Sequence, residues 1–303
     1  MKHFISLLDY SYEELRAVLD RADYLAGAWR ENRMPKSLRN KQIGLWFYGN
    51  GFRNRVAFEI GLKAMGADVS YIPGELGRGE PLEDVGQYLQ NWFSMLVIRA
   101  KSHKDLGLLS ESVEIPVINA RTNHNHPCEI MGDLQFIRIH RGSLDDLNVV
   151  FVGEVTNLCM SWFEAAVRFP IRVTQICPPG YEAKDTLIRE LNSKAIGNIS
   201  VSNDLDACME KADVIYTDCW PSAENTEMEE NIKKQFLPYQ ITGKRLSRLN
   251  SQSVFLPCPP VTRGQEVSAD AMKSELCLSC KAKEYLLHSQ NAIVEMVNSA
   301  ADF

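Results

Sequence analysis

The pattern of apolar and polar positions is clearest in residues 42–59, which read QIGLWFYGNGFRNRVAFE. An apolar run typical of a buried strand breaks at a Gly-Asn-Gly turn, and apolar positions then return at helical spacing. Val56, Ile60 and Ala64 recur at steps of four, which predicts one buried face for this helix. The stretch therefore predicts a strand, a tight loop and the start of a helix.

Two arginines, Arg53 and Arg55, fall in the first turn of this predicted helix. A helix N-terminus carries partial positive charge and N–H donors without intrahelical partners, so basic side chains there are unusual. A bound anion would explain them, because backbone N–H groups and guanidinium groups would converge on one phosphate. The alternative is that both arginines face water, and this stretch alone leaves the two interpretations open.

Strand-like and helix-like segments continue to alternate along the chain. The further expected strands are residues 67–72, 95–98, 116–119, 149–152, 171–177, 212–217 and 254–256. Such βαβ units require parallel sheets. We expect an α/β fold of two doubly wound parallel-sheet domains facing across a cleft, one of residues 1–140 and one of residues 141–285. The C-terminal helix, about residues 286–303, is expected to return to the first domain.

Composition limits the classes of function. The chain has 303 residues, 45% of them hydrophobic and 24% charged, as in a globular protein of two domains. A formal net charge of -6 makes nucleic acid an unfavourable partner. Without a long apolar run or a secretory leader, we expect a cytoplasmic protein that does not engage a membrane, with its eight cysteines reduced.

Metal binding is a minor interpretation of this sequence. Cys277 and Cys280 have the spacing of a redox pair or half a zinc site, but a second pair is missing and ordinary helix thiols are the better interpretation. His124 and His126 stand close together without a cysteine or carboxylate at a recognised ligand spacing. We expect neither a metal nor a cofactor.

Polar and reactive residues cluster where the predicted strands end. In an open parallel sheet the ligand crevice lies outside the carboxyl ends of the strands. In the first domain Arg99 and the loop of residues 121–126 take these positions; in the second they are Asn157, Asp218, Cys258 and Arg263.

Five motifs in order resemble the aspartate and ornithine carbamoyltransferases, more closely the ornithine branch. Residues 76–80 (LGRGE) resemble that branch's mobile loop, and residues 126–129 (HPCE) its His-Pro-x-Gln helix start. The remaining three are residues 152–157 (VGEVTN), 216–222 (YTDCWPS) and 258–267 (CPPVTRGQEV), which are similar to Val-Gly-Asp-x-Asn-Asn, Asp-Val-Trp-x-Ser-Met-Gly and Cys-Leu-Pro-Ala-His-Arg-Gly-Glu-Glu-Val.

The departures from the family pattern concern both substrates. The phosphate signature Ser-Thr-Arg-Thr-Arg is replaced by residues 51–55 (GFRNR), which keep both arginines but lose three hydroxyls. Each lost hydroxyl bond to a charged ligand would cost roughly 1.5 to 3 kcal/mol. Glu129 replaces the glutamine of His-Pro-x-Gln, and Pro257 and residues 223–224 also differ, so the acceptor is expected to differ from ornithine. The Phe52 ring must fill space near the donor or turn into the domain, and we expect the second.

The resemblance implies transfer of a carbamoyl group from carbamoyl phosphate to an amine of an amino-acid-like acceptor. It implies that residues 1–140 form the donor domain and that residues 141–285 form the acceptor domain. The implied catalytic residues are His126, Arg263, Cys258 and Arg99, with Cys258 near the attacking amine and not a nucleophile. The implied donor phosphate residues are Gly51, Phe52, Arg53, Asn54, Arg99 and Glu129. The implied acceptor residues are Asn157, Asp218 and Ser222. For each the alternative is an ordinary structural role, such as a surface arginine or a turn residue.

Three functional hypotheses remain open. The first is a carbamoyltransferase for an amine other than ornithine; the second keeps the scaffold but uses a different acyl-phosphate-type donor; the third is a catalytically silent, ligand-binding paralogue. The resemblance further implies a homotrimer with shared active sites, in which the loop around Arg78 reaches into a neighbouring copy.

Overall fold

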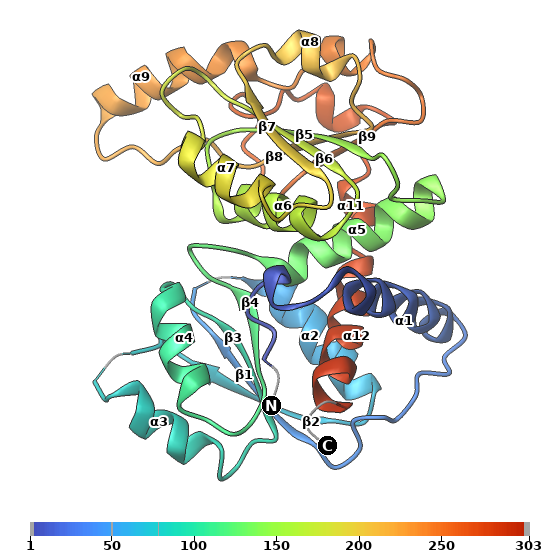
Figure 1. Ribbon diagram of the computed structural model, residues 1–303, viewed down its shortest axis with the longest axis vertical. Coiled ribbons are helices and arrows are strands. Elements are labelled where there is room, and N and C mark those ends of the chain that lie inside the picture. The colour runs from blue at the N-terminus through green and yellow to red at the C-terminus, as the bar shows by residue number, and fades with distance from the viewer. Residues whose placement is uncertain (1–2, 50, 78, 300–303) are drawn as a thin grey trace. The chain divides into compact units, whose positions relative to one another are not determined.

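The computed structural model in Figure 1 describes residues 3–49, 51–77 and 79–299. The chain forms two compact units, one of Met1–Ile139 with Lys283–Phe303 and one of His140–Ala282. Across these described residues, none of the helices is long and apolar enough to span a membrane, and His, Cys, Asp and Glu form no group of three or more that would hold a metal ion. Arg78 lies outside the described residues.

The sheet of the first unit has four parallel strands in the order β2-β1-β3-β4. They are β1 (Gln42–Phe47), β2 (Asp68–Pro73), β3 (Met95–Arg99) and β4 (Val117–Arg121). The chain moves from β1 to β2 on one side and later adds β3 on the other side of β1. The strand order therefore reverses between β1 and β3, which is where ligands bind in such sheets.

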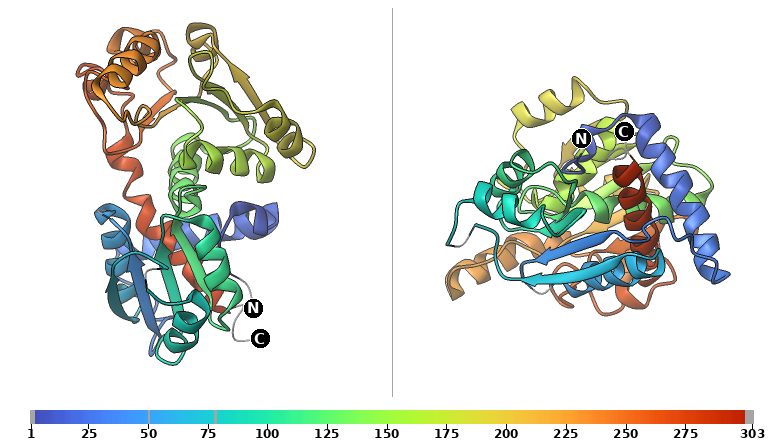
Figure 2. Two further views of the ribbon diagram at one scale, coloured as in Figure 1. Left: turned by 90° about the vertical axis from the view of Figure 1, so that its left-hand side faces the viewer. Right: turned by 90° about the horizontal axis from the view of Figure 1, so that it is seen from below.

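The C-terminal helix of the chain belongs to the first unit. The helices here are η1 (Leu7–Asp9), α1 (Tyr12–Arg30), α2 (Phe52–Ala64), α3 (Leu82–Leu89), α4 (His103–Glu111), α5 (Pro127–Arg141) and α12 (Tyr285–Ser299). α12 packs against α1 and α2 (Figures 1 and 2). Arg21 on α1 binds Glu295 on α12, with Nε 2.5 Å from Oε2. The expected return of this helix is confirmed.

The predicted buried face of α2 is wrong. Val56 is 40% exposed and Ile60 47% exposed, whereas Asn54, Phe58 and Leu62 are buried. Both sets recur at steps of four, so periodicity alone fits either face. The packing of α12 selects the face that carries Asn54, because buried partners satisfy its amide and Gly61 on the same side admits Asn291 from α12.

The second unit is built around a five-stranded parallel sheet in the order β7-β6-β5-β8-β9. Its strands are β5 (Asn148–Val152), β6 (Arg172–Ile176), β7 (Asn198–Ser202), β8 (Val214–Thr217) and β9 (Val254–Pro257). Its helices are α6 (Asn157–Arg168), α7 (Asp185–Asn192), α8 (Leu205–Met209), α9 (Thr226–Phe236), η2 (Leu237–Tyr239), α10 (Gly243–Leu246), η3 (Ala271–Lys273) and α11 (Ser279–Ala282).

Both faces of this second sheet are covered. Val150, Ile215 and Phe255 share one apolar cluster with residues of α8 and α10. On the opposite face, Tyr216 packs against Trp162 of α6, with ring centroids 5.4 Å apart. Successive strand residues point to opposite faces, so the near-continuous apolar runs in the sequence follow from burial on both sides. The predicted fold of two parallel-sheet α/β domains is confirmed.

Candidate active site

The first half of the candidate site lies where the strand order of the first unit reverses. Gly51 follows β1 and precedes α2, and Arg99 is the last residue of the neighbouring strand β3. A Cβ atom on Gly51 would lie 2.6 Å from Nε of Arg99, so a larger residue would push the guanidinium stem away from its present position. Arg99 is thereby held against the N-terminus of α2.

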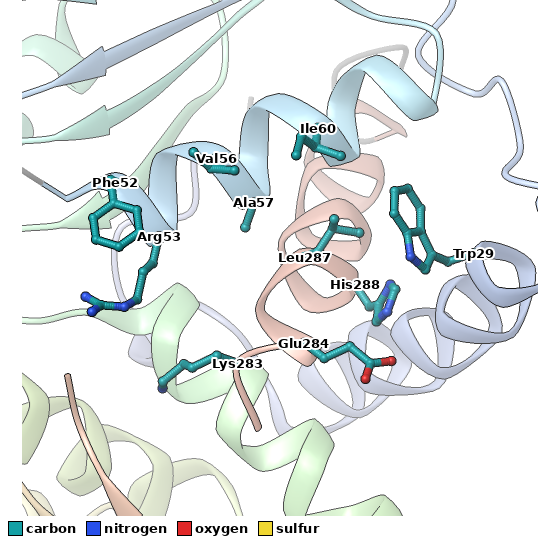
Figure 3. A pocket seen from close by; sticks show the side chains of 10 residues that line it. All are labelled: Trp29, Phe52, Arg53, Val56, Ala57, Ile60, Lys283, Glu284, Leu287 and His288. Carbon is teal, nitrogen blue, oxygen red and sulfur yellow. The ribbon is translucent and has the colours of Figure 1, made fainter. Parts of the chain in front are cut away.

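The first turn of α2 presents one arginine outward and keeps the other against the sheet. The Arg53 guanidinium lies over the Phe52 ring, with 4.6 Å between its Cζ and the ring centroid, and both side chains appear at the start of α2 in Figure 3. Arg55 lies over the ring of Tyr71 on β2, also at 4.6 Å. Phe52 is 49% exposed, so the expectation that its ring turns into the domain is wrong. Stacking on Arg53 keeps it at the surface.

A buried polar cluster lies behind this turn. The Asn54 amide donates to the Ala120 carbonyl at 3.0 Å and accepts from Gln290 at 3.1 Å, which fixes its orientation. Its nitrogen also lies 3.4 Å from Nε2 of His126. Both ends of this amide are therefore engaged inside the unit, and its backbone N–H is the group left for a phosphate at the helix start.

His126 is uncharged at neutral pH. It precedes α5 and is buried, and burial lowers the pKa of its imidazole to about 3. The carboxylate of Glu129, 3.6 Å from Nε2, opposes this effect, whereas the charges of Arg99, Arg121 and Lys283 reinforce it. A neutral imidazole can donate one hydrogen bond to a carbonyl oxygen and remain an acceptor at its other nitrogen.

Glu129 is ionised although it is buried. Burial by itself raises the pKa of this carboxyl, but the Lys283 ammonium, 2.6 Å from Oε1, acts together with His126 and Arg99 to hold the pKa below its ordinary value. Lys283 also lies 2.9 Å from Oδ1 of Asp133 one turn further along α5. The cluster thus combines a neutral imidazole with an ionised carboxylate whose charge is balanced by Lys283, next to two arginines. This environment suits an anion with a polarisable carbonyl.

The second half of the candidate site lies at the corresponding reversal in the second unit, between β5 and β8. Asn157 begins α6 after the loop that follows β5, and Asp218 follows β8. Cys258 follows β9, the strand next to β8, and its N–H donates to the Thr217 carbonyl at 2.8 Å. Thr156 caps α6 by accepting from the N–H of Cys159. The three site residues predicted from the sequence, Asn157, Asp218 and Cys258, therefore share one edge of the sheet.

This second half is acidic. Burial and the charge of Asp218 raise the pKa of Glu154 and the pKa of Glu266. Oε1 of Glu266 accepts from the N–H of Thr262, and Oε2 has no hydrogen-bond partner among the described residues. Carboxyl groups that resist ionisation next to one another favour a cationic ligand, because a bound ammonium relieves their repulsion.

Sequence reasoning missed Glu154, Glu266 and Lys283. Glu154 and Glu266 stand inside the motifs of residues 152–157 and 258–267, so their acidic character was the available signal. Lys283 had no comparable signal, because its partners are on α5. Ser222 and Arg263 are exposed on loops of the second unit. Arg263 and His126, expected to act on one carbonyl oxygen, belong to different units.

Comparison with known proteins gives matches over nearly the whole chain. Residues 2–139 match the model described as aspartate/ornithine carbamoyltransferase, carbamoyl-P binding domain, and residues 145–297 match its Asp/Orn binding domain. The ornithine carbamoyltransferase of Methanosphaera stadtmanae is 34% identical over 301 residues, covering 97% of this chain and 98% of that protein. The enzyme of the same name from Hydrogenovibrio crunogenus is 32% identical, with 99% of both covered.

Solved structures give the same result. The ornithine carbamoyltransferase from Pyrococcus furiosus superposes with a TM-score of 0.91 at 27% identity, covering 98% of this chain and 97% of that one. The structure from Burkholderia thailandensis gives a TM-score of 0.89 at 26% identity, with 98% of both chains covered. The similarity therefore extends over both units.

Proposed function

Because this chain belongs to the aspartate/ornithine carbamoyltransferase family and is a carbamoyltransferase, we propose that it transfers the carbamoyl group of carbamoyl phosphate to a cationic amino-acid-like acceptor other than ornithine. The observation that carries this proposal is the opposite charge of the two half-sites. Arg53, Arg99 and neutral His126 suit an anionic donor, whereas Asp218 with Glu154 and its neighbours suits an acceptor that bears an ammonium group.

In the proposed reaction an uncharged amine of the acceptor attacks the carbonyl carbon of carbamoyl phosphate. A C–N bond forms, and the tetrahedral intermediate collapses as the C–O bond to phosphate breaks. Phosphate leaves with the bonding electron pair, and the proton lost by the amine nitrogen goes to the leaving phosphate. No covalent enzyme intermediate is needed, so catalysis rests on positioning the reactants and on stabilising the oxyanion.

On the donor side, Arg53 and Arg99 would hold the phosphate with the backbone N–H groups that begin α2. His126 would donate to the carbonyl oxygen, with Arg263 implied by the family resemblance as a second donor. Glu129 would act through His126 and not on the phosphate itself, because it is ionised and would repel that group.

On the acceptor side, Asp218 would bind the ammonium of the amino-acid head, and Asn157 and Ser222 would complete that contact. Cys258 would lie near the attacking amine. The residues after Ser222 and before Cys258 differ from the family pattern, which supports an acceptor other than ornithine.

The decisive test is a mass-spectrometric search for ureido products with carbamoyl phosphate, ornithine and a panel of other diamino acids. We expect turnover with a diamino acid other than ornithine. Highest kcat/KM for ornithine would refute the acceptor assignment. Binding of carbamoyl phosphate by calorimetry without any product would favour a silent paralogue.

Phe52 supports one second candidate, an acyl-phosphate donor whose acyl group is more apolar than carbamoyl. Its half-exposed ring stacks on Arg53 and presents an apolar wall at the start of α2. Acetyl phosphate assayed beside carbamoyl phosphate, with wild type and Phe52→Thr, separates the two. Turnover of acetyl phosphate by wild type, shifting to carbamoyl phosphate in Phe52→Thr, would favour the changed donor.

The family resemblance also implies a homotrimer, and the outer face of α2 supports burial against another copy. Val56, Ile60, Trp29 and Leu287 line an apolar pocket of about 280 Å³ in the first unit (Figure 3). Ile60→Asp is expected to lower the sedimentation coefficient, with Ile196→Asp, at a 55% exposed position of the second unit, as the control. A wild-type monomer at micromolar concentration would refute the trimer.

A further inference from the structure

The C-terminal segment contacts both ends of the buried polar cluster in the first unit. Lys283, just before α12, binds Glu129 at 2.6 Å and Asp133 at 2.9 Å. Gln290 on α12 donates to Asn54 at 3.1 Å. Between these two contacts stands His126, 3.6 Å from Glu129 and 3.4 Å from Asn54. Figure 3 shows the Lys283 side chain extending away from that of its neighbour Glu284.

We propose that Lys283 is a positioning residue of the donor half-site, which engages the Glu129 carboxylate as an ion-pair partner and so prevents that carboxylate from drawing a proton onto His126. The inference deepens the proposed function, because there His126 is the group that donates to the carbonyl oxygen. Lys283 itself touches Glu129 and Asp133 and acts through them.

Burial makes this arrangement sensitive to the loss of one charge. The Lys283 side chain is 15% exposed, that of Glu129 9% and that of Asp133 1%. A buried carboxylate that loses its cation must be protonated or find another cation. For Glu129 the neighbouring base is His126, so removal of Lys283 would convert the neutral imidazole into the positively charged partner of an ion pair.

The charged groups that face His126 act on its pKa in opposite directions. Glu129 on α5 favours the imidazolium, whereas Arg99 at the end of β3, Arg121 at the end of β4 and Lys283 disfavour it. Asn54 on α2 contributes a neutral amide. Removing Lys283 both eliminates one opposing cation and releases the carboxylate, and each change raises the pKa of His126.

If the ion pair only tied the C-terminal segment to α5, removing Lys283 would leave the His126 imidazole uncharged. The experiment therefore compares the titration of His126 with and without Lys283. The chain is labelled with 13C at the histidine Cε1 position, and the His126 signal is assigned by its loss in His126→Gln. In wild type this signal is expected not to titrate between about pH 4.5 and 8, because the pKa of His126 is about 3. In Lys283→Gln its midpoint is expected to rise by about two pH units or more, which brings it into that range.

Three further variants complete the experiment. Lys283→Arg keeps the cation and should behave as wild type. Lys283→Gln/Glu129→Gln removes both charges and should restore a His126 that does not titrate. Lys63→Met removes an exposed ion pair, 2.7 Å long, with Glu59 on α2 and should leave His126 unchanged.

Lys283→Gln keeps an amide donor in place of the ammonium, so folding is expected to survive, and Lys283→Met serves as the second single variant. A folded Lys283→Gln and a folded Lys283→Met whose His126 signals both remain without titration would overturn the proposal. Because the measurement needs no turnover, failure of the carbamoyl-transfer assay would refute the proposed function while leaving this result intact. The kinetic counterpart is a new ionisation in the pH profile of kcat for Lys283→Gln, absent from Lys283→Arg.

Discussion

The two half-sites share a topology and differ in charge. In each unit a strand leads into a loop and a helix N-terminus at the point where the strand order reverses, with α2 after β1 and α6 after β5. The first reversal gathers arginines and a neutral histidine, whereas the second gathers Asp218 and two carboxyls with raised pKa values. Topology therefore sets the edge of each sheet at which a ligand is expected, and the side chains after each strand set the charge that this ligand is expected to bear.

The N-terminal caps of α2 and α6 also differ between the two half-sites. α6 begins with Thr156, whose hydroxyl accepts from a backbone N–H of its own first turn. α2 begins with Gly51, which offers no side-chain cap. The N–H groups of the donor half are thus left for an external anion, while one of those in the acceptor half is engaged internally.

The largest effect is expected at the donor half. Arg53→Ala should lower kcat/KM for carbamoyl phosphate by about 10²- to 10³-fold, because a charged contact to the leaving phosphate is lost. Arg55→Ala should change it far less, because Arg55 braces the helix over Tyr71. Steady-state kinetics and donor calorimetry measure both. Equal, small effects would return both arginines to a surface role.

The acceptor half should respond in a different parameter. Asp218→Asn should raise KM for the amine by about 10- to 100-fold, as expected for a lost charge-assisted contact, and leave calorimetric donor affinity unchanged. The control is Asp206→Asn, which removes an exposed partner of Arg245 on the same unit. A weakened donor affinity in Asp218→Asn would show that the two charges do not act separately.

Acid should destabilise the donor half through His126. The folded pKa of about 3 lies below the ordinary value of 6.5, so the unfolded chain binds the proton first and stability falls as pH drops through this window. Between about pH 6.5 and 4.5 this contributes about 2 kcal/mol to the loss of unfolding free energy. Denaturant titrations of His126→Gln should show a correspondingly flatter pH dependence.

The carboxyls of the acceptor half change stability in the opposite direction as pH falls. A pKa raised above the ordinary value of 4.5 means that the folded chain binds the proton first, so Glu154 and Glu266 favour folding as pH falls through the raised values. Glu154→Gln should therefore slightly steepen the loss of stability as pH falls through the raised pKa of Glu154. A flatter profile would show that burial and the charge of Asp218 do not raise the pKa of Glu154.

The smallest effect on ligand binding is expected at the close approach of Gly51 to Arg99. Gly51→Ala should weaken phosphate binding by roughly fivefold, or about 1 kcal/mol, because the flexible guanidinium stem can shift away from the new methyl group. Gly27→Ala on α1 meets nothing within 4 Å and should leave phosphate binding unchanged while stabilising the helix. Unchanged phosphate affinity in Gly51→Ala would place Arg99 outside the binding contact.

Much of this arrangement follows from the sequence itself. Continuous apolar runs alternate with segments of helical periodicity, which predicts parallel strands buried on both faces of a sheet. In such sheets ligands bind outside the carboxyl ends of the strands. Arg99, Asp218 and Cys258 could therefore be assigned to the ligand edge, since Arg99 ends a recognisable strand and the other two directly follow one. Local periodicity and strand order contain this information because both depend on neighbours in the sequence.

Tertiary structure alone decided two features. Residues 54, 58 and 62 and residues 56 and 60 both recur at helical spacing, and only packing against α12 buries the first set. Lys283 reaches Asp133 across 150 residues, and Gln290 reaches Asn54 across 236, so no local pattern links them to the donor half-site. A buried charge is satisfied by whichever partner the fold brings near, and that partner is set by the packing of distant elements rather than by spacing along the chain.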